Sequence, residues 1–440
     1  MSSSALRASS DSEPALLQAA EAANRSLASA VNDIESYIEK GTPAFMRTSL
    51  ALFSGGFATF ALLYCVQPMM PVLSQTFALT AAQSSLVLSI ATIMMALGLL
   101  VTGPISDAIG RKPIMVASLF CAALFTLASA VMPTWHGVLA MRALVGLSLS
   151  GLAAVGMTYL SEEIHPQHIG LSMGLYISGN AIGGMSGRLI TGVLVDFMSW
   201  HAAIAILGGL ALIAALVFWR VLPESRNFRP AALNLRQLAD GFGSHLRDAG
   251  LPWLFLEGFL LMGAFVTLFN YIGYRLLADP YHLSQAVVGV LSLVYLVGIY
   301  SSAWVGSLAD RLGRRKVLWA VIVLMLGGLL LTLLPPLPLI VLGMLLFTFG
   351  FFAAHSVASS WIGRRALKAK GQASSLYLFS YYLGSSVAGT TGGVFWHHFG
   401  WTGVGLFIAA LLSVAVLVAL HLARLAVLPR TLPALTTPHN

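Results

Sequence analysis

Residues 103–112 read GPISDAIGRK, and residues 306–315 read GSLADRLGRR. Both stretches follow the pattern G-x-x-x-D-x-x-G-R-K/R, and they begin 203 positions apart. A second related pair, GLSMGLYISGNAIGG (170–184) and GQASSLYLFSYYLGS (371–385), keeps nearly the same spacing. A repeat of about 200 residues is far longer than the unit of a solenoid. It indicates that the chain is built from two related halves.

The sequence between these stretches is too apolar for a water-soluble protein. Of its 440 residues, 58% are hydrophobic and only 9% are charged, whereas a soluble domain carries roughly 25% charged residues. Apolar segments of roughly 20 residues recur, which is the length of a helix that crosses a membrane. We therefore expect an all-α membrane protein with twelve transmembrane helices in two six-helix bundles. The predicted helices lie at about 49–70, 82–104, 113–132, 136–160, 169–195, 202–222, 252–275, 285–306, 317–334, 338–361, 372–396 and 402–424.

The distribution of basic residues predicts the orientation in the membrane. If both termini are cytoplasmic, all but three of the 24 Lys and Arg residues lie on the cytoplasmic side. Arg142 and Arg188 fall inside the membrane, and only Arg275 falls on the outer side. Basic residues concentrate on the cytoplasmic side of membrane proteins. The net charge of +8 is therefore explained by a bacterial inner membrane and requires no nucleic acid.

The same features divide the chain into five parts. The polar segment LNLRQLADGFGSHLRD (233–248) predicts an amphipathic helix at the membrane surface. Cys65 and Cys121 lie within apolar segments, which favours packing over a disulfide or a metal site. The predicted parts are a cytoplasmic tail at 1–45, a six-helix bundle at 46–222, a cytoplasmic linker at 223–250, a second six-helix bundle at 251–425 and a cytoplasmic tail at 426–440.

The loop pattern, placed between helices 2 and 3 and repeated between helices 8 and 9, resembles the signature of the major facilitator superfamily. The resemblance covers about residues 46–425. The stretches YCVQPMMPVL (64–73) and GNAIGGMSGRLITGVL (179–194) resemble one subgroup, the YnfM-type inner-membrane transport proteins, which lies near the sugar- and drug-efflux branches. The resemblance implies two bundles with pseudo-two-fold symmetry that rock about a site near the middle of the membrane.

The resemblance assigns a gating role to the loop motif. Its aspartate can pair with the arginine four residues later, or accept hydrogen bonds from the N-terminus of a neighbouring helix. Its glycines allow close helix contact and a tight turn. Fixing the topology through basic loops is the alternative role. Ala108 occupies a position where the family commonly has an arginine, which implies that the polar contacts of the first motif are weaker. The gating candidates are Gly103, Asp107, Gly110, Arg111, Gly306, Asp310, Gly313 and Arg314.

Two arginines lie at membrane depth in the first half, where a charge is costly and functional by default. Arg142, four residues before Gly146, resembles the helix-4 motif of the superfamily, which implies a link to proton transfer. Snorkelling to the membrane surface is the alternative. Helix 5 resembles the antiporter signature G-x-x-x-G-P-x-x-G-G, with Gly184 in place of proline and Arg188 in place of the last glycine. Either Arg188 pairs with Asp196, or Arg142 and Arg188 together bind an anionic substrate.

Two groups in the second half are candidates for carrying a proton. Glu257 has no compensating charge nearby in the sequence, and burial favours the neutral form of a carboxyl group. His355 titrates near neutral pH in water, although a hydrogen-bonded core histidine is an equal alternative. Both lie about two turns from the cytoplasmic side, where they could meet. The proton-coupling candidates are Glu257, His355, Arg142 and Asp196.

Polar residues on helices 1, 5 and 7 are the candidates for substrate contact. Tyr64 and Gln67 precede Pro68, which predicts a kink in helix 1. The segment FNYIGYRL (269–276) suggests a softened helix end that faces the outer mouth. Packing or anchoring at the interface is the alternative role for the aromatic residues. The substrate-binding candidates are Arg142, Arg188, Tyr64, Gln67, Asn180, Asn270, Tyr271 and Tyr274.

These observations favour a monomeric, proton-coupled secondary transporter of a small organic solute. Export by antiport is the leading interpretation, and uptake of an organic anion or a sugar by symport is the alternative. The duplicated halves and the lack of a repeated pore-lining ring argue against a channel. No H-E-x-x-H motif or P-loop occurs in the sequence, so neither an enzyme nor an ATP-driven pump is expected. No cofactor or metal is predicted.

Overall fold

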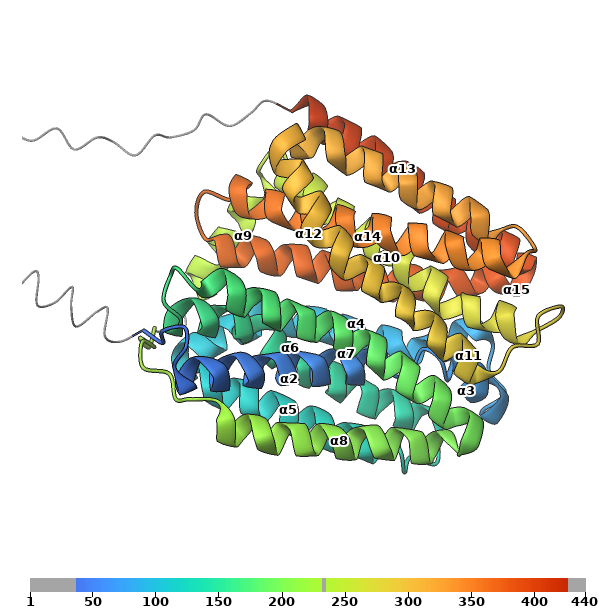
Figure 1. Cartoon of the computed structure of the whole chain (residues 1–440), viewed down its shortest axis with the longest axis horizontal. Coiled ribbons are helices and arrows are strands. Elements are labelled where there is room, and N and C mark those ends of the chain that lie inside the picture. The colour runs from blue at the N-terminus through green and yellow to red at the C-terminus, as the bar shows by residue number, and fades with distance from the viewer. Residues whose placement is uncertain (1–36, 232–234, 426–440) are drawn as a thin grey trace, which may run out of the picture.

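The computed structural model describes residues 37–231 and 235–425, and nearly all of these residues are helical (Figure 1). Most of the predicted tails, 1–45 and 426–440, and part of the linker fall outside the described residues. The elements are α2 (Pro43–Tyr64), α3 (Met70–Thr76), α4 (Ala81–Ile109), α5 (Arg111–Ser129), α6 (Trp135–Glu163), α7 (Ile169–Phe197), α8 (Trp200–Val221), α9 (Leu235–Leu246), α10 (Leu251–Leu277), α11 (Gln285–Val290), η1 (Leu291–Val294), α12 (Tyr295–Leu312), α13 (Arg314–Thr332), α14 (Leu337–Arg365) and α15 (Lys370–Arg424).

The length and composition of the helices establish an all-α membrane fold. Ten helices in the described ranges are long and apolar enough to cross a membrane. The 55-residue α15 counts once among them, although Gly400, with φ 58° and ψ −148°, breaks it between the last two predicted helices. α7 corresponds to the fifth predicted helix and is 29 residues long, but it is not among the ten, because polar residues and Arg188 interrupt its apolar sequence. These elements are consistent with the twelve predicted helices.

Polar side chains and glycines fix where the helices begin and end. The hydroxyl of Thr80 accepts a hydrogen bond from the backbone N–H of Gln83, whose side chain in turn binds the backbone N–H of Thr80. This reciprocal capping satisfies donors that a helix start leaves free. Gly110 and Gly313 have φ angles of 118° and 91° at the junctions α4–α5 and α12–α13. Because L-residues avoid positive φ, the predicted tight turns at both motif glycines are confirmed.

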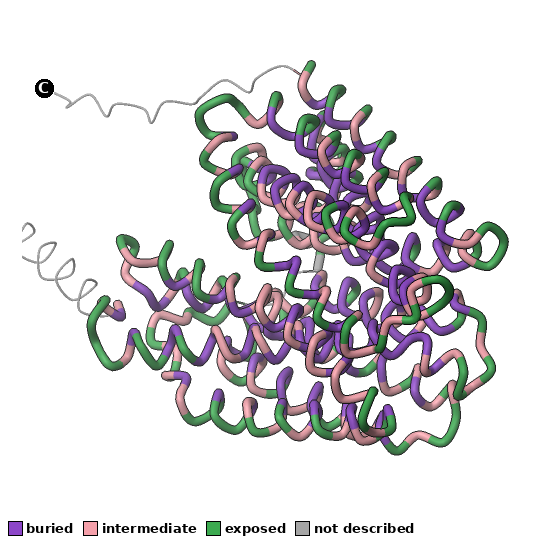
Figure 2. The backbone as a smooth tube through the Cα atoms, turned by 45° about the vertical axis from the view of Figure 1, so that its right-hand side comes forward, coloured by how far each residue is buried: buried purple, intermediate pink, exposed green. Residues whose placement is uncertain are grey.

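The helices form two bundles that meet at one end. α2 and α4 to α8 form one bundle, and α10 to α15 form the other (Figure 1). The two bundles diverge toward one end (Figure 2). That end holds the α4–α5 and α12–α13 junctions, with residues 103–112 and 306–315, and is here called the motif end (Figure 1). At the opposite end they are joined by hydroxyl contacts, Ser74 to Tyr274 at 2.7 Å and Thr390 to Ser89 at 2.8 Å. The structure is therefore a conformation closed at the end opposite the motifs.

Glycines allow the helices to approach closely within and between the bundles. Gly179, Gly183 and Gly187 of α7 lie against α2, where an added Cβ atom would come within 2.2–2.5 Å of a backbone oxygen. The glycines of the fifth predicted helix therefore pack closely against α2. Between the bundles, an added Cβ at Gly192 would lie 2.7 Å from the Cα of Gly289. The α9 helix confirms the predicted linker helix, and it lies beside α10 and α15.

Two close helix–helix contacts at glycine residues hold the end opposite the motifs closed. The two glycines, Gly192 and Gly393, occupy equivalent positions in the two halves. Gly192 of α7 faces Gly289 of α11, and Gly393 of α15 faces Ala82 of α4. Gly192→Leu and Gly393→Leu are expected to destabilise the closed conformation by about 1–3 kcal/mol, because overpacking forces the helices apart. Spin-label distances across this end should lengthen in both variants. Gly209→Leu is the control, because nothing lies within 4 Å of a Cβ there. Unchanged distances in both glycine variants would contradict the prediction.

Candidate functional site

Arg188 lies buried near the middle of α7, and its positive charge is held by neutral groups. Its Nε atom donates a hydrogen bond to Oε1 of Gln67 at 2.5 Å, and its Nη1 atom donates to the carbonyl oxygen of Gly184 at 2.6 Å. The rings of Tyr64 and Tyr295 lie 4.1 Å and 4.5 Å from its Cζ atom. Such cation–π contacts stabilise a desolvated guanidinium. No carboxylate of the described residues forms an ion pair with it, and Nη2 has no hydrogen-bond partner among them.

A cavity lies beside Arg188 at the junction of the two bundles. Its volume of about 30 Å³ is room for a water molecule but not for an organic solute. Solute binding therefore requires the surrounding side chains or the bundles to move. The break between α2 and α3 opens this space, because the helix ends at Tyr64 and resumes at Met70, as the prediction of a kink at Pro68 anticipates. The lining residues are Gln67, Pro68, Arg188, Phe269, Ile272, Gly273, Val288, Leu291, Ser292 and Met344.

Gln67 links Arg188 to the second bundle. Its Nε2 atom donates a hydrogen bond to Oδ1 of Asn270 at 2.7 Å. Asn270 is buried, and its Nδ2 atom has no hydrogen-bond partner among residues 37–231 and 235–425. Gln67 and Asn270 are separated by 203 residues, the same spacing as the loop motifs. Four of the predicted substrate-binding residues, Tyr64, Gln67, Arg188 and Asn270, are thus in one contact network.

Arg142 lies outside this network. Its guanidinium is 1% exposed and donates hydrogen bonds to the carbonyl oxygens of Leu62, Leu63 and Val87 at 2.8–3.2 Å. Leu62 and Leu63 belong to the last turn of α2, whose carbonyls have no partner within the helix. Arg142 and Arg188 line different cavities. The hypothesis that both arginines hold one anion is therefore wrong for this conformation, and so is the snorkelling alternative for Arg142.

The remaining polar candidates bind neighbouring helices. The hydroxyl of Tyr271 donates to the carbonyl oxygen of Gly389 at 2.6 Å, and Tyr274 binds Ser74. α10 continues to Leu277, so the predicted softened helix end is wrong, because these side chains fasten α10 to its neighbours. Asn180 is directed at Gly56 of α2 and does not line the cavity beside Arg188.

Asp196 ends α7 and joins the two bundles. Its two carboxylate oxygens accept hydrogen bonds from the backbone N–H groups of Gln285 and Ala286, at 3.0 Å and 2.8 Å. These groups belong to the first turn of α11, where a negative charge is favourable. The alternative in which Arg188 pairs with Asp196 is wrong, because the two residues lie about two turns apart along α7 and each has other partners.

Glu257 and His355 lie in the second bundle. Glu257 is fully buried on α10, and neither of its carboxyl oxygens has a hydrogen-bond partner within the ranges that the structure describes. His355 of α14 lies with its Nδ1 atom 2.8 Å from the hydroxyl of Tyr377. The ring of Tyr377 packs against Gly258, where an added Cβ would lie 2.6 Å away. The two predicted groups share no hydrogen bond, and Tyr377 of α15, which the sequence did not indicate, contacts His355 and the residue next to Glu257.

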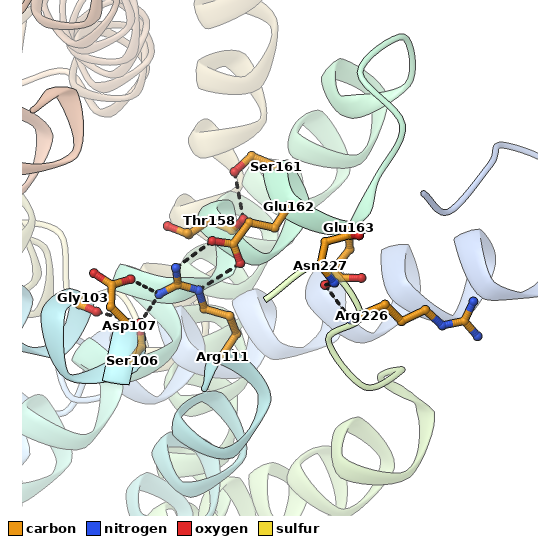
Figure 3. A network of polar contacts seen from close by, with 10 residues as sticks. All are labelled: Gly103, Ser106, Asp107, Arg111, Thr158, Ser161, Glu162, Glu163, Arg226 and Asn227. Carbon is orange, nitrogen blue, oxygen red and sulfur yellow. Dashed lines mark hydrogen bonds and ion pairs between the residues drawn. The ribbon is translucent and has the colours of Figure 1, made fainter. Parts of the chain in front are cut away.

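The first loop motif forms an ion-pair network at the motif end (Figure 3). Arg111 pairs with Asp107, as predicted, and also with Glu162 at the end of α6, through two hydrogen bonds of 2.6 Å and 3.0 Å. Glu162 and Glu163 are the only acidic residues in the sequence between Asp107 and Asp196, and this was the available signal for the partner. An added Cβ at Gly103 would meet nothing within 4 Å. Close helix contact at Gly103 is therefore wrong in this conformation.

The second motif repeats the arrangement in the other bundle. Asp310 pairs with Arg314 at 2.6 Å, as predicted, and with Arg364 of α14 at 3.0 Å. An added Cβ at Gly306 would lie 3.4 Å from the hydroxyl of Ser356, an ordinary contact. In both halves the motif thus ties its loop to a helix of the same bundle. The gating role of these pairs stays a prediction.

The linker is fastened by carboxylates at the same end. Glu163 accepts hydrogen bonds from the backbone N–H groups of Arg226 and Asn227, both at 2.9 Å. Asp248, after α9, pairs with Arg365 of α14. Burial alone would raise the pKa of Asp248, but Arg365 and two backbone N–H groups outweigh it and hold the pKa below its ordinary value.

The Arg111–Glu162 pair is expected to contribute to stability. Glu162→Gln leaves the buried Arg111 with one carboxylate, Asp107, and the hydroxyl of Ser106 as partners in the described part of the chain. We expect a loss of about 1–2 kcal/mol in the free energy of unfolding, reduced from the value for a buried pair because Glu162 is partly exposed. Thermal unfolding of the purified wild-type and variant proteins measures this loss of stability. Glu224→Gln is the matched control, because Glu224 pairs with Lys112 but is 79% exposed and should contribute little. Equal effects in the two variants would contradict the prediction.

Comparisons with known proteins agree with this architecture. The family model of the major facilitator superfamily matches residues 52–389 and 272–438. The chain is 64% identical over 394 residues to the inner membrane transport protein YnfM of Escherichia coli, covering 90% of this chain and 94% of that protein. It is 29% identical over 283 residues to the niacin transporter NiaP of Acinetobacter baylyi, covering 57% and 63% of the two chains.

A solved structure shows the same fold. A bacterial homologue of the human lysosomal transporter Spinster, in an inward-facing and unoccupied conformation, superimposes with a TM-score of 0.72 at 14% identity. The match covers 87% of this chain and 98% of the other. At this identity the likeness concerns the fold.

Proposed function

Because the chain belongs to the major facilitator superfamily of secondary transporters, we propose that it moves a small organic anion across the membrane by alternating access, with its movement coupled to protons. Membership makes the chain a membrane transporter of small solutes and not an enzyme. The proposal adds the charge of the solute and the coupling ion.

One observation carries the proposal: Arg188 is a buried cation without a carboxylate partner in the described part of the chain, beside a cavity between the bundles. A buried charge without a counter-charge is costly, and a guanidinium favours carboxylates that accept two hydrogen bonds. The Nη2 atom of Arg188 has no partner among the described residues, so this edge of the guanidinium can donate a hydrogen bond to a substrate oxygen. A sugar brings no negative charge to compensate Arg188, so the site supports an anion over a sugar.

Glu257 supports coupling to protons. A buried carboxyl group without hydrogen bonds favours its neutral form, so a change in hydration during bundle movement would let it bind or release a proton. Two directions follow. Export by antiport rests on the resemblance of α7 to the antiporter signature. Uptake by symport rests on charge balance, since an anion and a proton together cross as a neutral pair, and on the likeness to a niacin transporter.

The distribution of basic residues supports the orientation. We assign the motif end, with its linker, to the cytoplasm of a bacterial inner membrane. The conformation described is then closed toward the outside. The contacts at Arg188 and Glu257 lie within one chain, so a monomer suffices for transport.

Transport in proteoliposomes tests the proposal. Purified protein should accumulate nicotinate or benzoate when a pH gradient is imposed, and the gradient that drives accumulation identifies symport or antiport. Nicotinamide is the matched control, because it shares the ring of nicotinate but carries no negative charge. Equal movement of nicotinate and nicotinamide would overturn the anion site. Accumulation without any ion gradient would overturn the coupling.

A further inference from the structure

Three metal-ligating side chains converge at the motif end, away from the cavity beside Arg188. Glu39 lies in the segment before α2, and His165 and His168 lie in the loop between α6 and α7. Oxygens of Glu39 lie 3.7 Å from Nε2 of His165 and 3.6 Å from Nε2 of His168. We propose that these three residues form a binding site for a divalent transition-metal ion, with Zn²⁺ preferred.

The distances match ligands around a metal better than a hydrogen-bonded cluster. An N–H···O hydrogen bond spans about 2.7–3.2 Å between heavy atoms, so neither separation is one. Bonds of 2.0–2.1 Å to a tetrahedral zinc ion place neighbouring ligand atoms roughly 3.4 Å apart. All three ligand atoms lie within 4.8 Å of one another. Small adjustments of exposed side chains would therefore complete three metal bonds.

The backbone positions these ligands. The N–H of Ile38 donates to the carbonyl oxygen of Glu163 at 2.7 Å, and the N–H of His165 donates to the carbonyl oxygen of Ile38 at 3.2 Å. Ile38 itself is buried. These two hydrogen bonds hold the segment with Glu39 beside the loop. The N–H of His168 binds the carbonyl oxygen of His165 at 2.8 Å, so a turn places both rings on one side.

The chemistry of the donors selects the metal. Two imidazoles and one carboxylate suit Zn²⁺, Co²⁺ or Ni²⁺, whereas Ca²⁺ and Mg²⁺ prefer oxygen ligands. The side chains of His165, His168 and Glu39 are 19%, 28% and 44% exposed, so an ion can enter from solution and keep water in its remaining position.

One contact opposes metal binding and must change. The backbone N–H of Gln167 lies 3.3 Å from Nδ1 of His165, which places the ring proton of the neutral imidazole on Nε2. A metal at Nε2 requires that proton to leave and another to bind at Nδ1, with no net change in bound protons. The Gln167 contact is then lost. It is long for a hydrogen bond, so its loss is a small penalty compared with a metal bond.

A bound ion would link two parts of the chain that are more than a hundred residues apart in the sequence. It would join the segment before α2 to the loop that directly follows Glu162, the partner of Arg111. The inference is independent of the proposed substrate. The bound ion is expected to hold the segment before α2 and the α6–α7 loop together, and so to stabilise the motif end of the first bundle.

Metal titration of the full chain tests the site, with a purification tag that contains no histidine. Co²⁺ should bind one per chain with the visible absorption of a four- or five-coordinate ion, and Zn²⁺ should displace it. His168→Ala and Glu39→Gln are each expected to weaken Zn²⁺ binding by at least about tenfold. His397→Ala and His398→Ala, an adjacent pair far from the site in sequence, are the matched controls.

Two outcomes would overturn the site. One is a wild-type chain that binds no Co²⁺ or Zn²⁺ in competition with a weak chromophoric chelator. The other is a His165→Ala/His168→Ala double variant that still binds one ion with unchanged affinity. Thermal unfolding without metal checks that the variants are folded, and a variant that fails this check is replaced by His168→Gln, which retains a polar side chain.

Discussion

Replacing Arg188 by methionine is expected to abolish anion transport without weakening the fold. Of the described residues that line the cavity, Arg188 alone offers a full positive charge to a substrate, and the substitution removes it. It also removes a buried charge that has no carboxylate partner among the described residues, and the desolvation penalty of such a charge, several kcal/mol, offsets the loss of the hydrogen bonds to Gln67 and Gly184. The unfolding temperature in detergent should therefore stay the same or rise, while nicotinate transport in proteoliposomes falls to background.

Arg142→Met is the matched control, because the same substitution is expected to have the opposite effect on stability. It removes a donor from three buried carbonyl oxygens. The oxygen of Val87 keeps its partner within α4 and that of Leu62 keeps the thiol of Cys65, so the expected cost is that of leaving Leu63 unsatisfied, about 1–3 kcal/mol. Arg188→Lys adds a finer test, since it keeps the charge but loses the planar double donor, so affinity should fall without a complete loss of transport. Full transport by Arg188→Met would reject Arg188 as the anion site.

Replacing Glu257 by glutamine is expected to remove the coupling to protons while leaving exchange of the solute intact. Glutamine has nearly the same shape but cannot bind or release a proton. Accumulation driven by a pH gradient should disappear, whereas exchange of labelled for unlabelled nicotinate at equal pH should continue. Because both carboxyl oxygens lack partners, the substitution breaks no hydrogen bond, and expression and thermal stability should be retained.

Asp240→Asn controls for the loss of one acidic group, because Asp240 lies exposed on α9. Tyr377→Phe distinguishes the role of Glu257 from that of the neighbouring His355. It removes the hydroxyl that contacts His355 and keeps the ring. Normal accumulation by Glu257→Gln under a pH gradient would show that another group carries the proton.

Features that depend on neighbouring residues could be predicted from the sequence. The pairs Asp107–Arg111 and Asp310–Arg314 are four residues apart, so a helix followed by a tight turn brings them together in any version of the fold. The break near Pro68 follows from the missing N–H of proline. The two halves followed from the repeat, which survives in the sequence because both copies keep the same turn.

Features that depend on the packing of distant helices could not be predicted. Glu162 lies 51 positions from Arg111, and only the crossing of α5 and α6 makes them partners. The sequence offers Asp196 a charge partner on its own helix, Arg188, as one of two alternatives, whereas the carboxylate binds the start of α11. Arg142 resembled a functional arginine by its motif, but its contacts are main-chain oxygens of a neighbouring helix end. Hydrophobic periodicity shows that a helix crosses the membrane, but the rotation of that helix about its axis decides these contacts.

The hydrogen bond between Gln67 and Asn270 joins equivalent positions of the two halves. If a six-helix unit paired with a copy of itself, such a position would lie on the two-fold axis and face its own duplicate. A unit of that kind cannot place a longer side chain on one side only. Fusion into one chain lifts this constraint. Gln67, longer than Asn270 by one methylene group, also reaches Arg188, so the fused chain carries at this axis an asymmetry that a pair of identical units could not have.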